Sequence, residues 1–170
     1  MASYNQWMNA RIYAAAGQLS PEALVEDRKA FFHSVQGTLN HLVVADIIWL
    51  KRFAAHPSSF MALDPVRVLN APSSLDEWLY TDFTALSSYR DWLDRVVQDW
   101  AEELKEEDLS YSLSYTNMKG LKATKNFFDL ILHFFNHQTH HRGQVTTLLS
   151  QAGVDVGVTD LLALIPNESN

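Results

Sequence analysis

One stretch of the chain constrains its fold more than any other. Residues 126–152, NFFDLILHFFNHQTHHRGQVTTLLSQA, contain no proline, and their apolar side chains recur at helical spacing. Asn126 suits the N-cap of a helix, and Gly153 stands where a helix end favours a residue with positive φ. The stretch therefore predicts one continuous helix of about seven turns.

Two histidines lie inside the apolar stripe of this predicted helix. At ~100° per residue, His141 falls ~40° from His137, and Leu130 and Phe134 fall within ~60° of it. A buried neutral imidazole needs partners for both of its nitrogens. Spacing of four residues stacks the two rings on adjacent turns, where one ion can bind both. The pattern predicts a metal site that includes His137 and His141.

Two further histidines of this helix are less well placed. His133 borders the stripe at about −40°, which makes it a candidate for a group that supports the ligands or replaces one of them. His140 lies further out, and we expect it to face solvent or to form a local hydrogen bond. His33 and His56 fall in predicted connections, so we assign them no role.

A third imidazole could come from an earlier helix. Residues 35–55 predict a helix capped by Ser34, on which His41 shares a face with Ala45, Ile48 and Arg52. On spacing alone, His41 fits a hydrogen-bonded core histidine as well as a ligand. Three imidazoles with a fourth position open to water are typical of a catalytic zinc site, and nickel or ferrous iron also accepts imidazole ligands.

Metal-bound histidines usually donate their second ring N–H to a carboxylate or a carbonyl. The aspartates that could accept this proton are Asp46, Asp129 and Asp160, and the sequence does not choose among them.

The remaining segments predict two more long helices and a hairpin. Helical spacing covers residues 3–19, and a capping-box pattern at Ser74 predicts a helix over residues 74–105. Between them, residues 57–73 contain several prolines and serines and predict a long loop, of the kind that often borders a site. Residues 109–124 alternate around a turn at 117–120, which indicates a β-hairpin before the last helix. The sequence thus predicts an all-α four-helix bundle with a small β-hairpin, antiparallel or crossover-connected, as a single domain over residues 1–170.

The last predicted helix is apolar almost all round. Phe128, Ile131, Leu132 and Phe135 lie opposite the histidines. The hairpin and the tail, whose Leu161, Leu162 and Ile165 we expect to pack on the body, could cover this face. Burial against a second subunit is the other explanation, and it predicts a homodimer.

Composition narrows the function. Cysteine is absent, so any metal must have nitrogen or oxygen ligands. The formal net charge of −7 and the lack of a basic cluster argue against a nucleic-acid partner. The N-terminal residues lack the apolar core of a signal peptide, and no apolar run reaches membrane-spanning length. We therefore expect a cytoplasmic protein that does not bind membranes.

Two segments carry a resemblance to a known family. GTLNHLVVADIIWLKRF and FNHQTHHRGQVTTLLSQAGVD resemble the DinB family, within the DinB/YfiT-like superfamily, and the similarity runs from YNQWMNARIY to GVTDLLALIP. The resemblance implies a four-helix bundle whose metal is held by one histidine of the second helix and two of the last. Those positions correspond to His41, His137 and His141 here.

The resemblance implies less about the reaction. Characterised relatives in the superfamily include thiol-dependent S-transferases and a thiol-dependent isomerase. We therefore expect a metal-dependent enzyme, an S-transferase or a hydrolase, acting on a small molecule with a low-molecular-weight thiol or water as nucleophile. His133 and Tyr4 are the candidates for a general acid or base. The alternatives are a non-catalytic protein that binds a metal or small ligand in a stress response, and a protein whose histidines only hydrogen-bond in the core.

Overall fold

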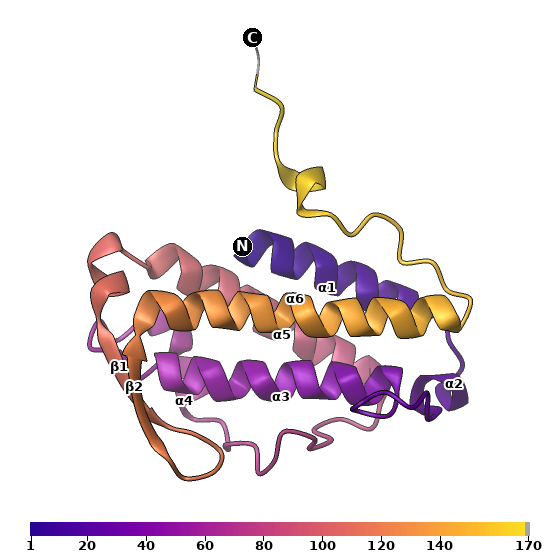
Figure 1. Ribbon diagram of the computed structural model, residues 1–170, viewed down its shortest axis with the longest axis horizontal. Coiled ribbons are helices and arrows are strands. Elements are labelled where there is room, and N and C mark those ends of the chain that lie inside the picture. The colour runs from indigo at the N-terminus through magenta and orange to yellow at the C-terminus, as the bar shows by residue number, and fades with distance from the viewer. Residues whose placement is uncertain (169–170) are drawn as a thin grey trace.

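Four long helices form the body of the protein. The structure is a computed structural model that describes residues 1–168. The long helices are α1 (Ala2–Ala16), α3 (Val35–Phe53), α5 (Phe83–Glu103) and α6 (Phe127–Gln151). Figure 1 shows them lying side by side, with α6 packed against both α1 and α3, and α1 packed against α5. The predicted four-helix bundle is confirmed.

The connection between α3 and α5 crosses the length of the bundle. Gln36 at the start of α3 donates from Nε2 to the carbonyl of Thr81, 2.8 Å away and just before α5, so these two helices begin at the same end. Contacts of Trp49 with His133 and of Phe53 with Phe127 show that α3 and α6 are antiparallel. The bundle is therefore crossover-connected, one of the two arrangements that the sequence allowed.

Side-chain caps start the three later long helices. Ser34 Oγ accepts from the Gly37 N–H at 3.0 Å, and Asn126 Oδ1 accepts from the Asp129 N–H at 3.2 Å, as predicted. Asp82 caps α5 in the same way. The last helix ends before Gly153, whose φ of 79° confirms the predicted C-terminal signal.

The prediction of a helix from Ser74 was wrong, because α5 begins only at Phe83. Glu77 does form a local bond, but its Oε2 accepts from Ser73 Oγ, one residue before the predicted cap at Ser74. The buried amide of Asn40 instead fixes the loop by accepting from the Tyr80 N–H and donating to the Tyr80 carbonyl, both at 3.0 Å. Contacts to α3 thus override a helix-start signal that is local.

The long loop predicted over residues 57–73 contains two short helical elements. This segment contains a 3-10 turn, Met61–Leu63, and the short helix α4 (Asp64–Arg67), and it buries Phe60, Leu63 and Val66 against the core. Another short helix, α2 (Pro21–Val25), follows α1. Apolar side chains within the connection therefore hold short helical elements against the core, which the proline content of the segment did not predict.

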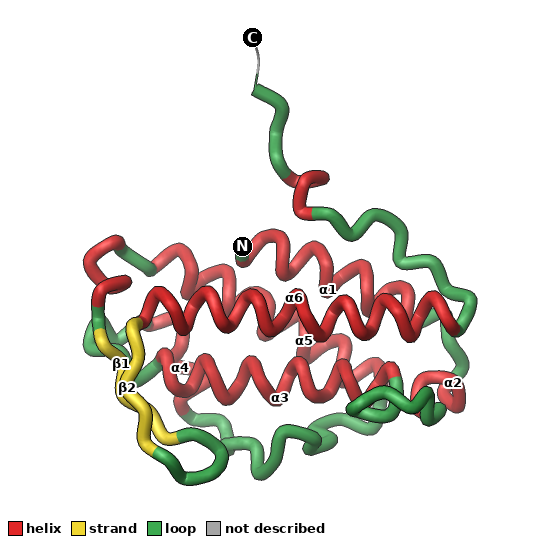
Figure 2. The backbone as a smooth tube through the Cα atoms, in the orientation of Figure 1, coloured by secondary structure: helices red, strands yellow, loops and turns green. Residues whose placement is uncertain are grey.

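The predicted hairpin is present. Strands β1 (Ser112–Thr116) and β2 (Lys122–Asn126) pair antiparallel, with Tyr115 opposite Ala123. Figure 2 shows the hairpin leading directly into α6. Residues of the turn at 117–121 line a cavity described below.

The tail does not pack on the body as predicted. Tyr4 and Arg11 of α1 bind the carbonyls of Thr159 and Val156, but beyond Asp160 the chain leaves the bundle (Figure 1). Leu162 is 74% exposed, and Leu161 and Ile165 are exposed as well. The contacts between α1 and this part of the chain are hydrogen bonds from Tyr4 and Arg11 to its backbone, and none of the three apolar side chains is buried.

The face of α6 opposite the histidines is only half covered. Ile131 and Phe135 are buried, whereas Phe128 and Leu132 are 45% and 52% exposed.

Among residues 1–168, no helix combines the length and apolarity that crossing a membrane requires.

A buried polar network joins all four long helices. Arg90 of α5 forms ion pairs with Asp46 of α3 at 2.6 Å and with Asp94 at 2.9 Å. Asn9 of α1 donates to Asp94 at 2.8 Å, and neighbouring Asn5 accepts from Arg142 of α6. The helices are thus registered by hydrogen bonds as well as by apolar packing.

Candidate metal centre

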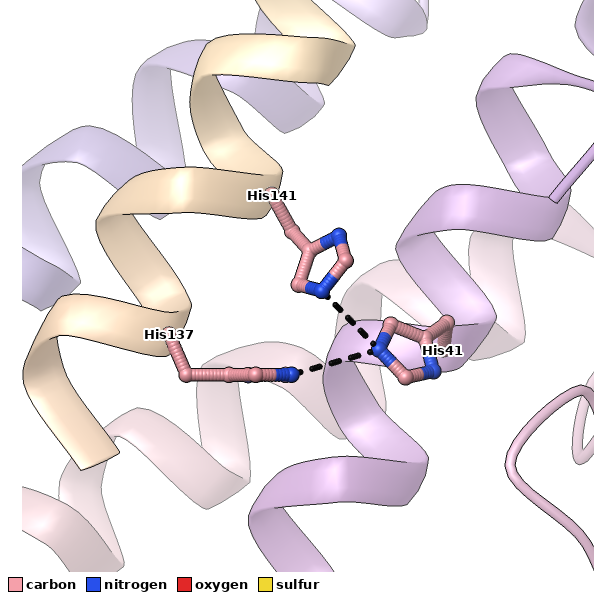
Figure 3. Close-up of side chains that lie close together, drawn as sticks. All are labelled: His41, His137 and His141. Carbon is pink, nitrogen blue, oxygen red and sulfur yellow. Dashed lines mark hydrogen bonds between the residues drawn. The ribbon is translucent and has the colours of Figure 1, made fainter. Parts of the chain in front are cut away.

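Three imidazoles meet between α3 and α6. Figure 3 shows His41 on α3 facing His137 and His141, which lie one turn apart on α6. His41 Nε2 lies 3.4 Å from His137 Nε2 and 3.2 Å from His141 Nε2. One ligand atom from each residue lies within 4.8 Å of the others, so the group could hold a metal ion.

The outer nitrogens of two rings show where the protons are. His41 Nδ1 lies 2.7 Å from the carbonyl oxygen of Leu75, which can only accept, so Nδ1 carries the proton. His141 Nδ1 lies 2.8 Å from Gln144 Oε1, and the amide nitrogen of Gln144 faces His140, which fixes the same tautomer. In the neutral rings both Nε2 atoms then hold lone pairs. Two lone pairs cannot hydrogen-bond to each other, whereas a cation between them satisfies both.

The two spacings measured from His41 Nε2 suit a tetrahedral ion. Metal–nitrogen bonds of about 2.0–2.1 Å at the tetrahedral angle put the nitrogens about 3.3 Å apart. The Nε2 separations of 3.2 and 3.4 Å agree with that value. The donor set contains only imidazole, which zinc, nickel and ferrous iron all accept.

Burial keeps these imidazoles neutral. It lowers the pKa of His41 to about 4, although the hydrogen bond to Leu75 raises it, and it lowers the pKa of His137 to about 3. Burial also lowers the pKa of His141, with the bond to Gln144 acting in the other direction. At neutral pH all three rings are in the form that binds metals.

The centre is closed on one side and open on the other. Phe32 stacks on His41 with ring centroids 3.8 Å apart and turns its edge towards His141. On the other side, His41 and His137 line a cavity of about 470 Å³. Ala45, Ile48 and Arg52 line it too, which confirms the face predicted for this helix.

The predicted aspartates do not orient the imidazoles. Asp46 is paired with Arg90 in the core, Asp129 is exposed at the start of α6, and Asp160 is exposed in the tail. The acceptors are the Leu75 carbonyl and Gln144. Gln144 lies three residues after His141 and could have been found from helical spacing. Leu75 could not, because its position depends on the fold of the loop.

The other candidates take different places. The ring of His133 packs on Trp49 with centroids 5.0 Å apart and lies 5.9 Å from that of His137. Among the described residues no hydrogen bond joins His133 to the three imidazoles. His140 binds Gln144 at the surface, as expected for a local contact. The Tyr4 hydroxyl donates to the Thr159 carbonyl, so it is not a group of this centre.

The fold and the site together define a helical-bundle protein with a three-histidine group that could hold a metal ion. Comparison with known families agrees: the DinB family profile matches residues 1–168, and the chain belongs to this family. Protein DinB of Bacillus subtilis (strain 168) is 26% identical over 160 residues, which cover 92% of this chain and 87% of that protein. No solved structure gave a significant match.

Proposed function

We propose that this protein is a metal-dependent enzyme whose divalent ion is held by His41, His137 and His141. The observation that carries the proposal is the convergence of three Nε2 atoms, two of which are fixed as lone-pair donors by the outer hydrogen bonds of their rings. Zinc or nickel is the expected ion, with iron as the alternative. A bound ion would supply Lewis acidity that lowers the pKa of a thiol or a water molecule at the open position.

Residues of the chain would orient the ligand rings, exclude water and admit the substrate. Leu75 and Gln144 hold two ligand rings in the correct tautomer, which maintains their basicity and orientation. Phe32 excludes water from one side of His41. The cavity on the other side is large enough to admit a small-molecule substrate.

Transfer to or from a low-molecular-weight thiol is the reaction we favour, ahead of hydrolysis. The support is the resemblance to thiol-dependent transferases of the superfamily, together with a site made of imidazoles that a soft thiolate could join. The proposed setting is the cytoplasm, with no nucleic-acid partner, in keeping with the net charge of −7.

A homodimer forms part of the proposal. Its support is the exposed apolar surface of Phe128 and Leu132 on α6 and of the tail beyond Asp160, which a second copy of the chain could cover.

Metal content and turnover test the proposed function. Untagged protein should contain about one zinc or nickel per chain after loading and dialysis, measured by mass spectrometry of the elements. His137→Ala should lose the ion, whereas Ser150→Ala, at an exposed position of the same helix, should keep it. Consumption of thiols would be followed with 1-chloro-2,4-dinitrobenzene and related electrophiles.

The outcomes separate the alternatives. Thiol transfer that His137→Ala abolishes supports the enzyme. Stoichiometric metal without turnover of any thiol or electrophile favours a metal-binding protein of the stress response. Metal far below one per chain in the wild type contradicts both.

A further inference from the structure

The cavity beside the histidines has an unusual composition for an acidic protein. It extends along α3 from His41 to Arg52, a rise of about 16 Å. Arg52 and Lys119 supply positive charge, and no aspartate or glutamate lines it. A chain with a formal net charge of −7 thus presents a cavity of the opposite sign.

Arg52 is positioned like a residue that binds a ligand. Its guanidinium lies over the rings of Trp49 and Tyr115, 4.6 and 4.7 Å from their centroids, and Nη2 donates to the Thr116 carbonyl at 3.3 Å. These contacts fix the plane of the guanidinium. Among residues 1–168, no carboxylate forms a salt bridge with Arg52, although burial half removes it from water and lowers its pKa. A partly desolvated cation without a counter-ion favours an anion.

The walls between the two ends are apolar and aromatic. Trp49 packs against His133, which in turn lies next to His137, so aromatic rings follow one another from Arg52 to the centre. Ile48 and Leu121 add aliphatic surface. The cavity therefore suits an elongated molecule with an apolar middle and a charge at one end.

We propose that this cavity binds a monoanionic carboxylate, whose carboxylate group pairs with Arg52, whose apolar portion lies along Trp49, and whose reactive end reaches the three histidines. Thr116 occupies one nitrogen of Arg52, and the edge that remains free can donate to both oxygens of a carboxylate. Lys119, exposed on the hairpin turn, contributes a screened attraction. The inference names the substrate class of the proposed enzyme. It rests on the proposed function only for the reactive end of the ligand, because the anion site depends on Arg52 and not on a metal.

The test uses a matched pair of probes, 6-mercaptohexanoate and 6-mercaptohexanamide, which differ only in charge. Calorimetric titration of the wild type should give about tenfold tighter binding of the carboxylate, both without metal and with one equivalent of zinc. Arg52→Gln should remove this preference, weakening the binding of the carboxylate much more than that of the amide, without changing the zinc content. Arg52→Lys should retain part of it. Arg95→Gln, at an exposed arginine of α5, should leave it intact.

Several results would overturn the inference. Equal affinity for the two probes in the wild type would do so, as would equal losses for both in Arg52→Gln, since those indicate lost packing. A preference that disappears in His137→Ala but survives in Arg52→Gln would place the carboxylate at the histidines. If the wild type binds no metal yet keeps the preference in an Arg52-dependent manner, the proposed enzyme fails while the anion site stands.

Discussion

At the scale of single residues, the position of one proton determines whether His41 can bind a metal. The Leu75 carbonyl holds that proton on Nδ1, so the nitrogen that faces His137 and His141 is free to bind a cation. With the proton on Nε2 instead, the hydrogen bond to Leu75 would be lost and an N–H would point into the centre, where it would block metal binding. A backbone carbonyl from a loop is therefore as important to this site as the histidine itself.

The lowered pKa values predict how many protons leave on metal binding. At pH 6.0, three histidines with the ordinary pKa of about 6.5 would carry about two protons between them. With their pKa values lowered to about 4 and 3, His41 and His137 are already neutral there, and His141, whose pKa is also lowered, carries less charge than a free histidine. Zinc titrations at pH 6.0 in buffers of different ionisation enthalpy should give release well below one proton per ion. Release of about two would contradict the burial of these rings.

The same shifts give the sign of an acid effect on the metal-free protein. A histidine whose folded pKa is lowered binds fewer protons than the unfolded chain, so its contribution to stability falls as pH drops from about 6.5 towards the folded values. Burial raises the pKa of Asp46 to about 6, which acts in the opposite direction over the lower part of this range. The effect of the histidines is therefore obtained by comparing the pH dependence of the free energy of unfolding in the wild type and in a variant that lacks one of the three histidines.

At the scale of elements, the helices and the loops differ in how far the sequence predicts them. The histidine helix was predicted to within a residue at each end, because its caps and its apolar period are local. The segment before α5 was predicted wrongly, because buried amides of α3 hold it in place. The same distinction applies to the site: the three imidazoles follow from periodicity and the family resemblance, whereas Leu75 and Phe32 reach it only through folded loops.

Two glycines offer a matched test of how the element before α3 supports the centre. A Cβ on Gly37 would lie 2.2 Å from the Phe32 carbonyl oxygen, whereas one on Gly143 of α6 meets no atom within 4 Å. Gly37→Ala should lower the free energy of unfolding by about 1–3 kcal/mol, because the backbone of Phe32 must shift off His41. Gly143→Ala should raise it by about 0.5–1 kcal/mol, because alanine favours helix. Urea denaturation measures both.

The shift of Phe32 away from His41 should also weaken the affinity for zinc in Gly37→Ala. The affinity of Gly143→Ala should equal that of the wild type. Equal stability of the two variants would show that Phe32 is not packed tightly against α3.

At the scale of the whole molecule, the buried network couples the four helices. Arg90 neutralises Asp46 and Asp94, each almost fully buried, so Arg90→Ala leaves both carboxylates without their cation. We expect a loss of about 3–5 kcal/mol, a large part of the stability of a domain of this size. Arg95→Ala, at an exposed position on α5, should change stability by no more than about 0.5 kcal/mol.

The same denaturation curves test the prediction of a single domain. One transition, with fluorescence and circular dichroism coinciding, is expected for a bundle joined in this way. Two separate transitions in the wild type would contradict it.

The last prediction concerns assembly, because both α6 and the tail expose large apolar side chains. Leu161, Leu162 and Ile165 leave the body on an extended tail, and α6 exposes Phe128 and Leu132. A stable interface buries on the order of 1,200 Å² or more, which scattered single residues do not supply but a tail and a helix face together can. Light scattering after size-exclusion chromatography should therefore give about twice the 19.3 kDa chain mass.

The double variant Leu162→Ser, Ile165→Ser should shift the protein towards the monomer, because it removes apolar surface that only a second copy would bury. Val68→Ser provides the control, since Val68 is the most exposed of the large apolar side chains and lies in the crossover connection, away from both surfaces. Its mass should match that of the wild type. A wild-type monomer at 100 µM, a concentration we choose to favour association, would rule out the homodimer, and the exposed leucines of the tail would then need a different partner.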